Sequence, residues 1–373
     1  MIHRIVALLL LAGAAFAQPP ASAQIESIFA PLARGKSPGL AVLVRKDGRT
    51  VFQRGYGVGD LRTLRRIDAV TDFRLASFTK QFTAMAVMLL VHDGTLRYDQ
   101  PLTDTFPGFP AYARAITLRH LLTHTSGLPD YEEVMDAHLW TPEHQIQDED
   151  VLTLLQRQTT PKFAPGTSWA YSNSAYVLLG LIVAKASGQP FGQFLEHRVF
   201  QPLHMTNTLV YRTGRNTVPH RAFGHSKIAD GFVQADQSST SATLGDGGIY
   251  SNLADLAKWD AALQNHTLLG EPEMSAALTP VTLANGGPPS WPSAPGDDNL
   301  SPGKPVAYGF GWFLDPYRGH SRMWHTGSTQ GFRTVIQRFP DEKLTVIVLC
   351  NRTDLDAAAL ALQAADLFLK SPQ

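Results

Sequence analysis

The stretch RLASFTKQFTAMAVMLL, residues 74–90, places a serine and a lysine three positions apart at the start of an apolar run. The apolar side chains after Lys80 recur at helical spacing, which predicts a helix beginning at Ser77. One turn apart, the two side chains share a face of that helix. A serine hydroxyl becomes a strong nucleophile when a nearby base removes its proton, so Ser77 and Lys80 are a candidate nucleophile and base. Taken alone, the pair fits an N-cap serine and a solvated first-turn lysine better.

Lysine can act as a base only when its pKa is lowered. The reference value of about 10.4 must fall by roughly 3 units, at a cost of about 4 kcal/mol that burial can impose. The apolar residues around Lys80 permit such burial. A second S-x-x-K sequence, Ser301 to Lys304, contains Pro302 and Gly303, which argue against a helix and so against a shared face.

Composition and the first residues predict a globular, exported protein. The chain has 373 residues, a formal net charge of zero and 44% hydrophobic residues, which gives no indication of nucleic acid or an acidic partner. A basic pair at positions 3 and 4 precedes an apolar run, and two small-x-small sites end at Ala17 and Ala23. This pattern predicts a signal peptide within residues 1–23 and a periplasmic or secreted mature chain. No later segment is apolar enough to predict an integral membrane span.

The pattern of elements predicts an α+β fold of one unit, residues 24–373. Short β-like runs lie near both ends of the chain, at 39–44, 50–52, 309–314, 321–324, 333–339 and 344–349. Helical patterns fill the middle, at 82–92, 118–124, 151–156, 175–186, 191–199 and 253–263, and terminal helices are expected at 25–32 and 354–369. We therefore expect an antiparallel sheet built from both chain ends (24–100 plus 305–373), flanked by the terminal helices, with a mostly helical lobe (101–304) inserted.

Several residues are interpreted as structural. The single cysteine, Cys350, lies in an apolar run and is expected in the core, without a disulfide. His120 and His124 are spaced as two metal ligands, but H-E-x-x-H is absent, so we interpret them as structural histidines of the helical lobe. Ser37 lies in a G-x-S-x-G sequence whose flanking elements have the wrong order for a nucleophile. The Pro- and Gly-rich stretch 285–305 is expected to be a surface loop, with a lid over a site as the alternative.

Two further motifs accompany the serine–lysine pair. Tyr171-Ser172-Asn173 precedes an apolar helix within FAPGTSWAYSNSAYVLLG (163–180), and His325-Thr326-Gly327 leads into a strand within MWHTGSTQGFRTVI (323–336). Together the three segments resemble the penicillin-recognising serine hydrolases, which are class C β-lactamases, D-alanyl-D-alanine carboxypeptidases and their esterase and D-aminopeptidase relatives. The resemblance covers nearly the whole mature chain and includes, in the same order, ITLRHLLTHTSGLPDY (116–131), the tyrosine segment itself, VFQPLHMTNT (199–208), GDGGIYSNLADLAKW (245–259) and YGFGW (308–312).

The resemblance implies a β-lactamase/transpeptidase-like fold, with the active site between the sheet and the helical lobe. It also implies that Ser77 forms an acyl-enzyme, that Lys80 is its base and that Tyr171 moves protons to the leaving group. Tyr171 and Lys80 are then coupled titrating groups. Neither a metal nor a cofactor is expected.

By the same resemblance, the remaining motif residues position the substrate. Asn173 is expected to hydrogen-bond Lys80 and the substrate amide, and Thr326 to help hold the substrate. Gly327 is expected to let the substrate backbone lie close to its strand. The oxyanion is expected to lie on the backbone N–H groups of Ser77 and Ser328.

His325 departs from the pattern, because β-lactamases and carboxypeptidases usually have a lysine there that helps hold the substrate carboxylate. Histidine, with a reference pKa of about 6.5, is mostly neutral at pH 7. Arg333 can supply a replacement cation or be an exposed strand residue. We therefore expect a hydrolase of small esters, amides or peptides. A β-lactamase or D-Ala-D-Ala carboxypeptidase is the alternative, followed by a non-catalytic relative that binds cell-wall fragments or a partner. The motifs do not indicate an oligomeric state.

Overall fold

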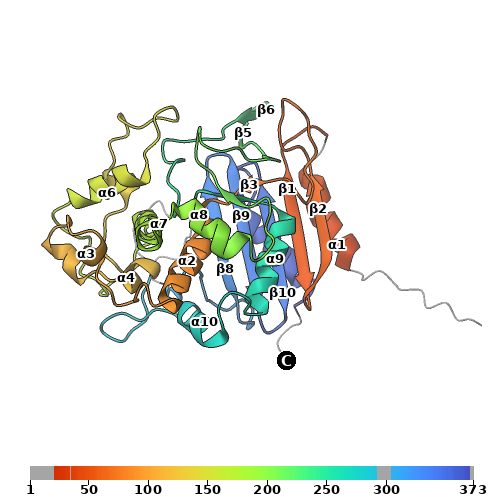
Figure 1. Ribbon diagram of the computed structural model, residues 1–373. Coiled ribbons are helices and arrows are strands. Elements are labelled where there is room, and N and C mark those ends of the chain that lie inside the picture. The colour runs from red at the N-terminus through yellow and green to blue at the C-terminus, as the bar shows by residue number, and fades with distance from the viewer. Residues whose placement is uncertain (1–20, 34, 292–303, 370–373) are drawn as a thin grey trace, which may run out of the picture.

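A five-stranded antiparallel sheet forms the centre of the molecule in the computed structural model, which describes residues 21–33, 35–291 and 304–369 (Figure 1). Its strands are β1 (Leu40–Lys46), β2 (Arg49–Tyr56), β8 (Met323–Thr329), β9 (Phe332–Phe339) and β10 (Leu344–Cys350), in the order β2-β1-β10-β9-β8. The turn between β1 and β2 uses Asp47 and Gly48, both with positive φ, as a tight hairpin requires. Because β1 pairs with β10, the sheet joins both chain ends, which confirms the expected fold class.

Helices cover both faces of this sheet. Alternate β1 residues, such as Leu40 and Val42, pack with α1 (Ala21–Phe29) and α11 (Ala357–Asp366), so the terminal helices flank one face. The β1 residues between them, Ala41 and Leu43, lie on the opposite face and belong to the core shared with α2 (Lys80–His92) and α9 (Leu253–Gln264). A sheet buried on both faces explains why β1 and β10 read as continuous apolar runs.

The segment between the sheet strands is mostly helical and lies to one side of the sheet (Figure 1). It contains α3 (Leu102–Thr105), α4 (Leu118–Leu122), α5 (Tyr131–Val134), α6 (Asp148–Gln156), α7 (Asn173–Ser187), α8 (Phe191–Leu195) and α10 (Glu271–Leu278). It also contains short strands that the sequence did not predict: β4 (Leu209–Val210), β7 (Ile249–Ser251), β5 (His225–Ile228) and β6 (Gly231–Gln234). β3 (Phe73–Arg74), β7 and β4 form a small second sheet. The lobe boundaries at 100 and 305 stay a prediction. Helix α9 falls inside the predicted lobe, yet it packs against β1 of the main sheet.

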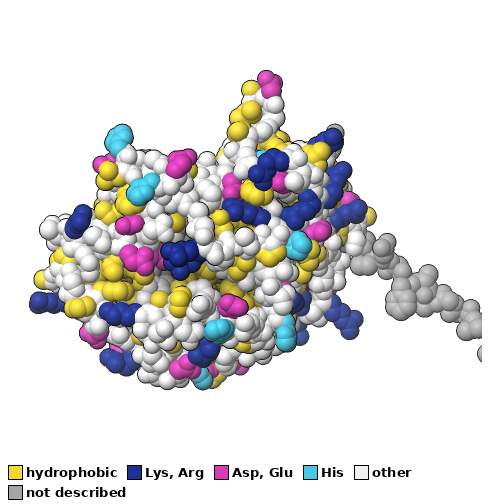
Figure 2. Space-filling model, turned by 45° about the horizontal axis from the view of Figure 1, so that its top comes forward, with side chains coloured by type: hydrophobic (Ala, Val, Ile, Leu, Met, Phe, Trp, Pro, Cys, Tyr) yellow, Lys and Arg dark blue, Asp and Glu magenta, His cyan; other side chains and the backbone are white. Residues whose placement is uncertain are grey.

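Hairpin β5–β6 projects from the surface as a finger in Figure 2, where basic and acidic side chains are otherwise interspersed. The apolar side chains of Ile228 and Val233 are exposed on this finger. Among the described residues, no helix is long and apolar enough to cross a membrane.

Several boundaries predicted from the sequence were wrong. Residues 309–314 form no strand and make only isolated bridges, since Gly311 has a φ of 76° and a Cβ at Gly309 would lie 1.8 Å from the Ala277 carbonyl oxygen. Strand β8 begins at Met323 rather than 321. Helix α11 spans 357–366 instead of 354–369, because Asp356 caps it by accepting a hydrogen bond from the Ala359 N–H at 2.9 Å.

Other predictions fall partly outside the described residues. Residues 1–20 of the predicted signal peptide and residues 292–303 of the 285–305 loop lie there, so neither the leader nor the lid is tested. Cys350 is fully buried in β10, and burial raises the pKa of its thiol to about 12, as expected of a core cysteine.

A buried ionic network ties α9 to the main sheet. Asp260 on α9 forms an ion pair with Arg45 of β1, with 2.8 Å between Asp260 Oδ2 and Arg45 Nε. Its Oδ1 accepts hydrogen bonds from Arg338 Nε of β9 at 2.8 Å and from Thr345 Oγ1 of β10 at 2.7 Å. One carboxylate thus connects three strands to one helix.

Candidate active site

Ser77 lies in the 3₁₀ turn η2 (Ala76–Thr79), which runs directly into α2 at Lys80. The predicted helix start at Ser77 falls within a 3₁₀ turn that begins at Ala76, and the α-helix itself begins at Lys80. Residues three apart in a 3₁₀ turn eclipse one another, and Lys80 Nζ donates a hydrogen bond to Ser77 Oγ at 3.0 Å. Ala76 has a φ of 50°, a left-handed conformation that makes the turn before the serine sharp.

Lys80 is fully buried although it carries a titratable amine. Its Nζ also donates to Asn173 Oδ1 at 2.9 Å and to the Asp246 carbonyl oxygen at 3.1 Å. Desolvation lowers the pKa of Lys80 to about 8, against the opposing carboxylates of Asp246, Asp130 and Glu132. About one tenth of this amine is therefore neutral at pH 7 and able to accept a proton.

Tyr171 lies beside this pair, immediately before α7. Ser172 is the N-cap of α7, and its Oγ accepts a hydrogen bond from the Ala175 N–H at 3.2 Å, which fixes where the helix starts. Lys80 Nζ lies 4.8 Å from the centroid of the Tyr171 ring. Burial raises the pKa of Tyr171 well above its ordinary value, although the hydrogen bond with the Ser77 hydroxyl opposes this rise. The phenol is therefore protonated at neutral pH and can donate or relay a proton.

The third motif lies on the edge strand β8, which faces η2. Thr326, Gly327 and Ser328 line the same cleft as Ser77. A Cβ at Gly327 would lie 2.0 Å from the Leu75 carbonyl oxygen, so glycine lets β8 approach the segment that carries the serine. The sequence did not predict this close approach of β8 to Leu75. It predicted only that Gly327 lets the substrate backbone lie close to its strand. The oxyanion role of the Ser77 and Ser328 N–H groups stays a prediction.

His325 is a buried, neutral residue of β8. Its Nδ1–H donates to the Thr326 carbonyl oxygen at 2.6 Å, so Nε2 accepts from the Tyr308 hydroxyl at 3.1 Å. Burial, with a smaller contribution from Lys80, lowers the pKa of His325 to about 3. Position 325 therefore offers no cation to a substrate carboxylate.

Arg333 lines the outer part of the cleft and is half-buried. Its Nη1 donates to the carbonyl oxygens of Thr329 at 2.9 Å and Phe332 at 2.8 Å. The guanidinium thus holds the turn between β8 and β9. Its role as a carboxylate contact stays a prediction.

The loop 123–131 holds the Tyr171 motif in place. The His124 carbonyl oxygen accepts from the Ala170 N–H at 3.0 Å, and His124 Nδ1 accepts from the Ser172 N–H at 3.1 Å. Asp130 Oδ2 accepts from the Asn173 N–H at 2.5 Å. The sequence predicted a structural role for His124 but did not indicate that this loop contacts the Tyr171 motif, because no local pattern shows these contacts.

Two connected hollows meet at Ser77. The larger is a cleft of about 650 Å³, whose lining includes Tyr171, Asn173, Trp291, Phe313, Gly327 and Arg333. The smaller is a polar pocket of about 110 Å³, whose lining includes Arg74, Tyr131, Glu132, Thr243, Asp246 and Ser328. Tyr171 lines the cleft and not the pocket.

The small pocket contains the carboxylates of Glu132 and Asp246 and the guanidinium of Arg74, which donates a hydrogen bond to the Ser241 carbonyl oxygen at 2.9 Å. Asp246 is buried, and its Oδ1 has no hydrogen-bond partner within the described ranges. Glu132 reaches solvent and lines both hollows. Partial desolvation and the neighbouring carboxylates of Asp130 and Asp246 raise the pKa of Glu132 to about 7. A cationic group in this pocket would lie near two carboxyl groups, of which Glu132 is partly ionised at pH 7.

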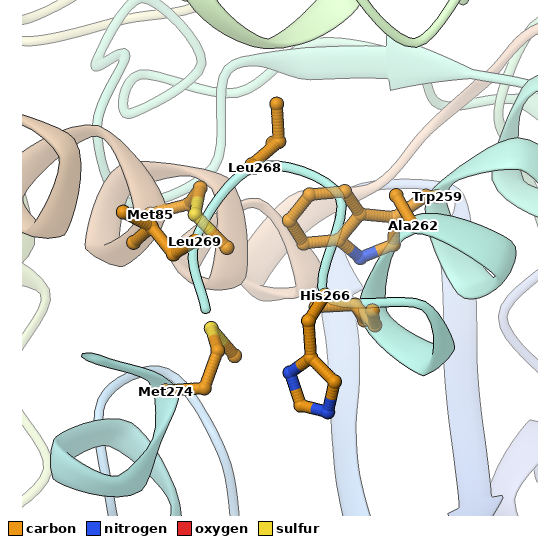
Figure 3. Close-up of a pocket in the computed structure, with 8 residues that line it drawn as sticks. Met85, Trp259, Ala262, His266, Leu268, Leu269 and Met274 are labelled. Atoms are coloured by element: carbon orange, nitrogen blue, oxygen red, sulfur yellow. The ribbon is translucent and has the colours of Figure 1, made fainter. Parts of the chain in front are cut away.

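A separate hollow contains none of the candidate catalytic residues. Figure 3 shows a small apolar pocket between α2, α9 and α10, with Met85, Trp259 and Met274 on its walls and His266 at one side. Its free volume of about 10 Å³ holds about one water molecule, too little for a ligand. Within residues 21–33, 35–291 and 304–369, no group of three His, Cys, Asp or Glu side chains could hold a metal ion.

The sheet, the lobe and the Ser-Lys-Tyr-Asn cluster define a β-lactamase-type serine hydrolase. The sequence model of the β-lactamase family matches residues 25–369, so the chain belongs to this family. The resemblance drawn from the three motifs is thereby confirmed.

Individual relatives fall into two groups. The chain is 31% identical over 343 residues to a penicillin-binding protein of Bacillus subtilis, covering 88% of this chain and 71% of that protein. It is 28% identical over 344 residues to a D-aminopeptidase of Cereibacter sphaeroides, covering 91% of this chain but only 61% of that protein. Among solved structures, a penicillin-binding protein of Bacillus halodurans has a TM-score of 0.74 at 26% identity, with 93% and 98% of the two chains covered.

Proposed function

We propose that this protein hydrolyses small amides and esters through an acyl-enzyme on Ser77. The observation that carries the proposal is the 3.0 Å hydrogen bond between Lys80 Nζ and Ser77 Oγ, made by an amine whose pKa burial lowers to about 8. This arrangement places a partly neutral base on the only hydroxyl of η2 that also lines the cleft. Export on the predicted signal peptide remains part of the proposal.

Acylation follows from the positions of these groups. Neutral Lys80 takes the proton from Ser77 Oγ as the oxygen attacks the substrate carbonyl carbon. The oxyanion is stabilised by the N–H groups of Ser77 and Ser328. Tyr171 donates its proton to the leaving nitrogen or oxygen as that bond breaks, and regains a proton from Lys80.

Deacylation uses the same groups in the opposite direction. A water molecule enters the cleft and loses a proton to the Tyr171–Lys80 pair as it attacks the acyl carbon. Ser77 Oγ leaves as the acid product forms and recovers its proton, which restores the starting state.

The electrostatics of the two hollows favour an acyl group that carries an ammonium. Tyr171 lines the cleft, so the leaving group that it protonates lies there, and the acyl group occupies the small pocket with Glu132 and Asp246. A substrate carboxylate finds neutral His325 instead of the usual lysine. The similarity to a D-aminopeptidase supports substrates with a free amino group.

A matched substrate panel tests this proposal. We expect D-alanine 4-nitroanilide to be hydrolysed with a kcat/KM at least about tenfold above that of propionyl 4-nitroanilide, which lacks only the ammonium. 4-Nitrophenyl acetate should also be hydrolysed, and a chromogenic cephalosporin should be the poorest substrate. Ser77→Ala should abolish every activity. Glu132→Gln should reduce the preference for the ammonium substrate and leave hydrolysis of propionyl 4-nitroanilide within about twofold.

The opposite ranking would overturn the substrate assignment. If the cephalosporin is the best substrate, the protein is a β-lactamase and a cation other than residue 325 holds the carboxylate. If Ser77→Ala retains wild-type turnover, the catalytic assignment itself is wrong. A protein that binds cell-wall fragments equally well with alanine at position 77, and hydrolyses nothing, is a binding relative.

The pH dependence provides a second prediction. For 4-nitrophenyl acetate, corrected with Ser77→Ala, kcat/KM should rise with a midpoint near pH 8, because only neutral Lys80 accepts the serine proton. The rate should not fall again below about pH 10, because burial raises the pKa of Tyr171 above its ordinary value. A rate that is flat from pH 6 to 9 would show that Lys80 is not the base.

A further inference from the structure

His124 contacts the backbone on both sides of Tyr171. Its carbonyl oxygen accepts from the residue before the tyrosine, Ala170, at 3.0 Å, and its Nδ1 accepts from the residue after it, Ser172, at 3.1 Å. The imidazole also lies against the phenol, with ring centroids 4.4 Å apart and an interplanar angle of 37°. One residue therefore contacts the backbone on both sides of Tyr171 and also its ring, with the side chain making the contacts to Ser172 and to the ring.

The state of His124 suits a fixed support rather than a proton carrier. It is fully buried, and its Nε2 has no hydrogen-bond partner among the residues the structure describes. Because Nδ1 accepts a hydrogen bond, the proton is on Nε2. Burial first, and then Lys80 and His325, hold the pKa of His124 well below its ordinary value. The ring thus remains neutral beside the Lys80 amine.

His124 also adopts an uncommon backbone conformation. Its φ is 60°, in the left-handed region that most side chains avoid. The loop turns back at this residue, which brings the carbonyl oxygen and Nδ1 of one residue to the same short segment. A core histidine that only filled space would not require this geometry.

We propose that His124 is the positioning residue of Tyr171, holding the phenol at the Ser77–Lys80 pair for proton transfer. The inference rests on the proposed acyl-enzyme function. A displacement of about 1 Å in a catalytic group costs roughly 10²-fold in rate. Loss of His124 should therefore lower kcat and leave KM nearly unchanged, because substrate binding does not require Tyr171 to transfer a proton.

Two substitutions separate the parts of this role. Asn tolerates the left-handed conformation, and its Oδ1 is attached to Cγ as Nδ1 is in histidine, so His124→Asn keeps the acceptor for Ser172 and loses the ring. Gly also tolerates the conformation, so His124→Gly loses both the acceptor and the ring. We expect kcat for 4-nitrophenyl acetate to fall about tenfold in His124→Asn and about 10²-fold in His124→Gly, with KM within about threefold.

A double-mutant cycle with Tyr171→Phe distinguishes positioning from general support of the fold. If His124 acts through the phenol, His124→Asn should cost less than about twofold in kcat once Tyr171 is phenylalanine. His120→Asn is the matched control, since His120 lies four residues earlier and its ring Nδ1 hydrogen-bonds Thr117 at the start of α4. That control should leave kcat within about twofold.

These experiments distinguish failure of the His124 proposal from failure of the proposed function. If wild-type turnover survives Ser77→Ala, the proposed function fails. Tyr171 then has no proton transfer at Ser77 for which His124 could position it. If turnover depends on Ser77 but His124→Asn costs as much in the Tyr171→Phe background as in the wild type, His124 is only structural. Should His124→Gly fail to fold, the cycle with His124→Asn still decides between the two.

Discussion

Lys80→Met is expected to lower kcat/KM for 4-nitrophenyl acetate about 10⁴-fold, or about 5 kcal/mol of transition-state stabilisation. Methionine has a similar length and no charge, so it fills the buried space between α2 and α7 without supplying a base. The loss is large because Lys80 Nζ is the amine that hydrogen-bonds both Ser77 Oγ and Asn173 Oδ1. Steady-state kinetics of purified wild-type and variant protein provide the measurement.

Two controls distinguish loss of the catalytic base from general damage to the fold. Ser77→Ala with Lys80→Met should be no slower than Ser77→Ala alone, because residues that act as one unit are not additive. The melting temperature of Lys80→Met should stay close to that of the wild type, because relief of the desolvation cost of the buried amine opposes the loss of its three hydrogen bonds. A variant with more than a tenth of wild-type kcat/KM would exclude Lys80 as the base.

Asp260→Asn is expected to have the largest effect on stability, about 3–5 kcal/mol in the free energy of unfolding. Asn removes the charge that balances two guanidinium groups, Arg45 and Arg338, whose side chains are only about one tenth exposed. Both cations would then remain in the protein interior without a counterion. Because Asp260 connects α9 to three strands, the loss should appear in the global unfolding transition measured with urea.

An exposed ion pair provides the matched comparison. Asp99 pairs with Arg97 at 3.4 Å, and both side chains are mostly exposed. Asp99→Asn should change the unfolding free energy by less than about 1 kcal/mol, because water screens such pairs. If Asp260→Asn costs no more than this control, the buried network does not stabilise the sheet.

Much of the sheet could be predicted from local patterns. Residues 40–44 of β1 and 346–350 of β10 are apolar at every position because both faces are buried, and such runs identify strands whatever their partners. Residues 309–314 read similarly, yet the carbonyl oxygen of Ala277 excludes any side chain at Gly309 and the chain turns instead. A contact between residues 277 and 309 depends on tertiary packing, which no window of sequence contains.

The candidate catalytic cluster could be located from the sequence for a different reason. Ser77, Lys80, Tyr171 and Asn173 belong to motifs whose residue types are dictated by acyl transfer, and the structure brings all four together. The supports of the cluster have no such chemical signature. The left-handed turn at His124 arises from the fold around it, and a histidine in an apolar segment looks the same whether or not it holds a tyrosine.

The pairing of β1 with β10 also governs when the protein can fold. Leu40 lies opposite Cys350, so the central pair of the sheet closes a loop that contains most of the chain. Closing such a loop carries an entropic cost and slows folding. A growing chain on the ribosome has the β1–β2 hairpin long before β10 is synthesised, and until then the open edge of β1 can pair with strands of other chains. We expect folding, and with it the assembly of β8 against Ser77, to be completed only after the last strands are released.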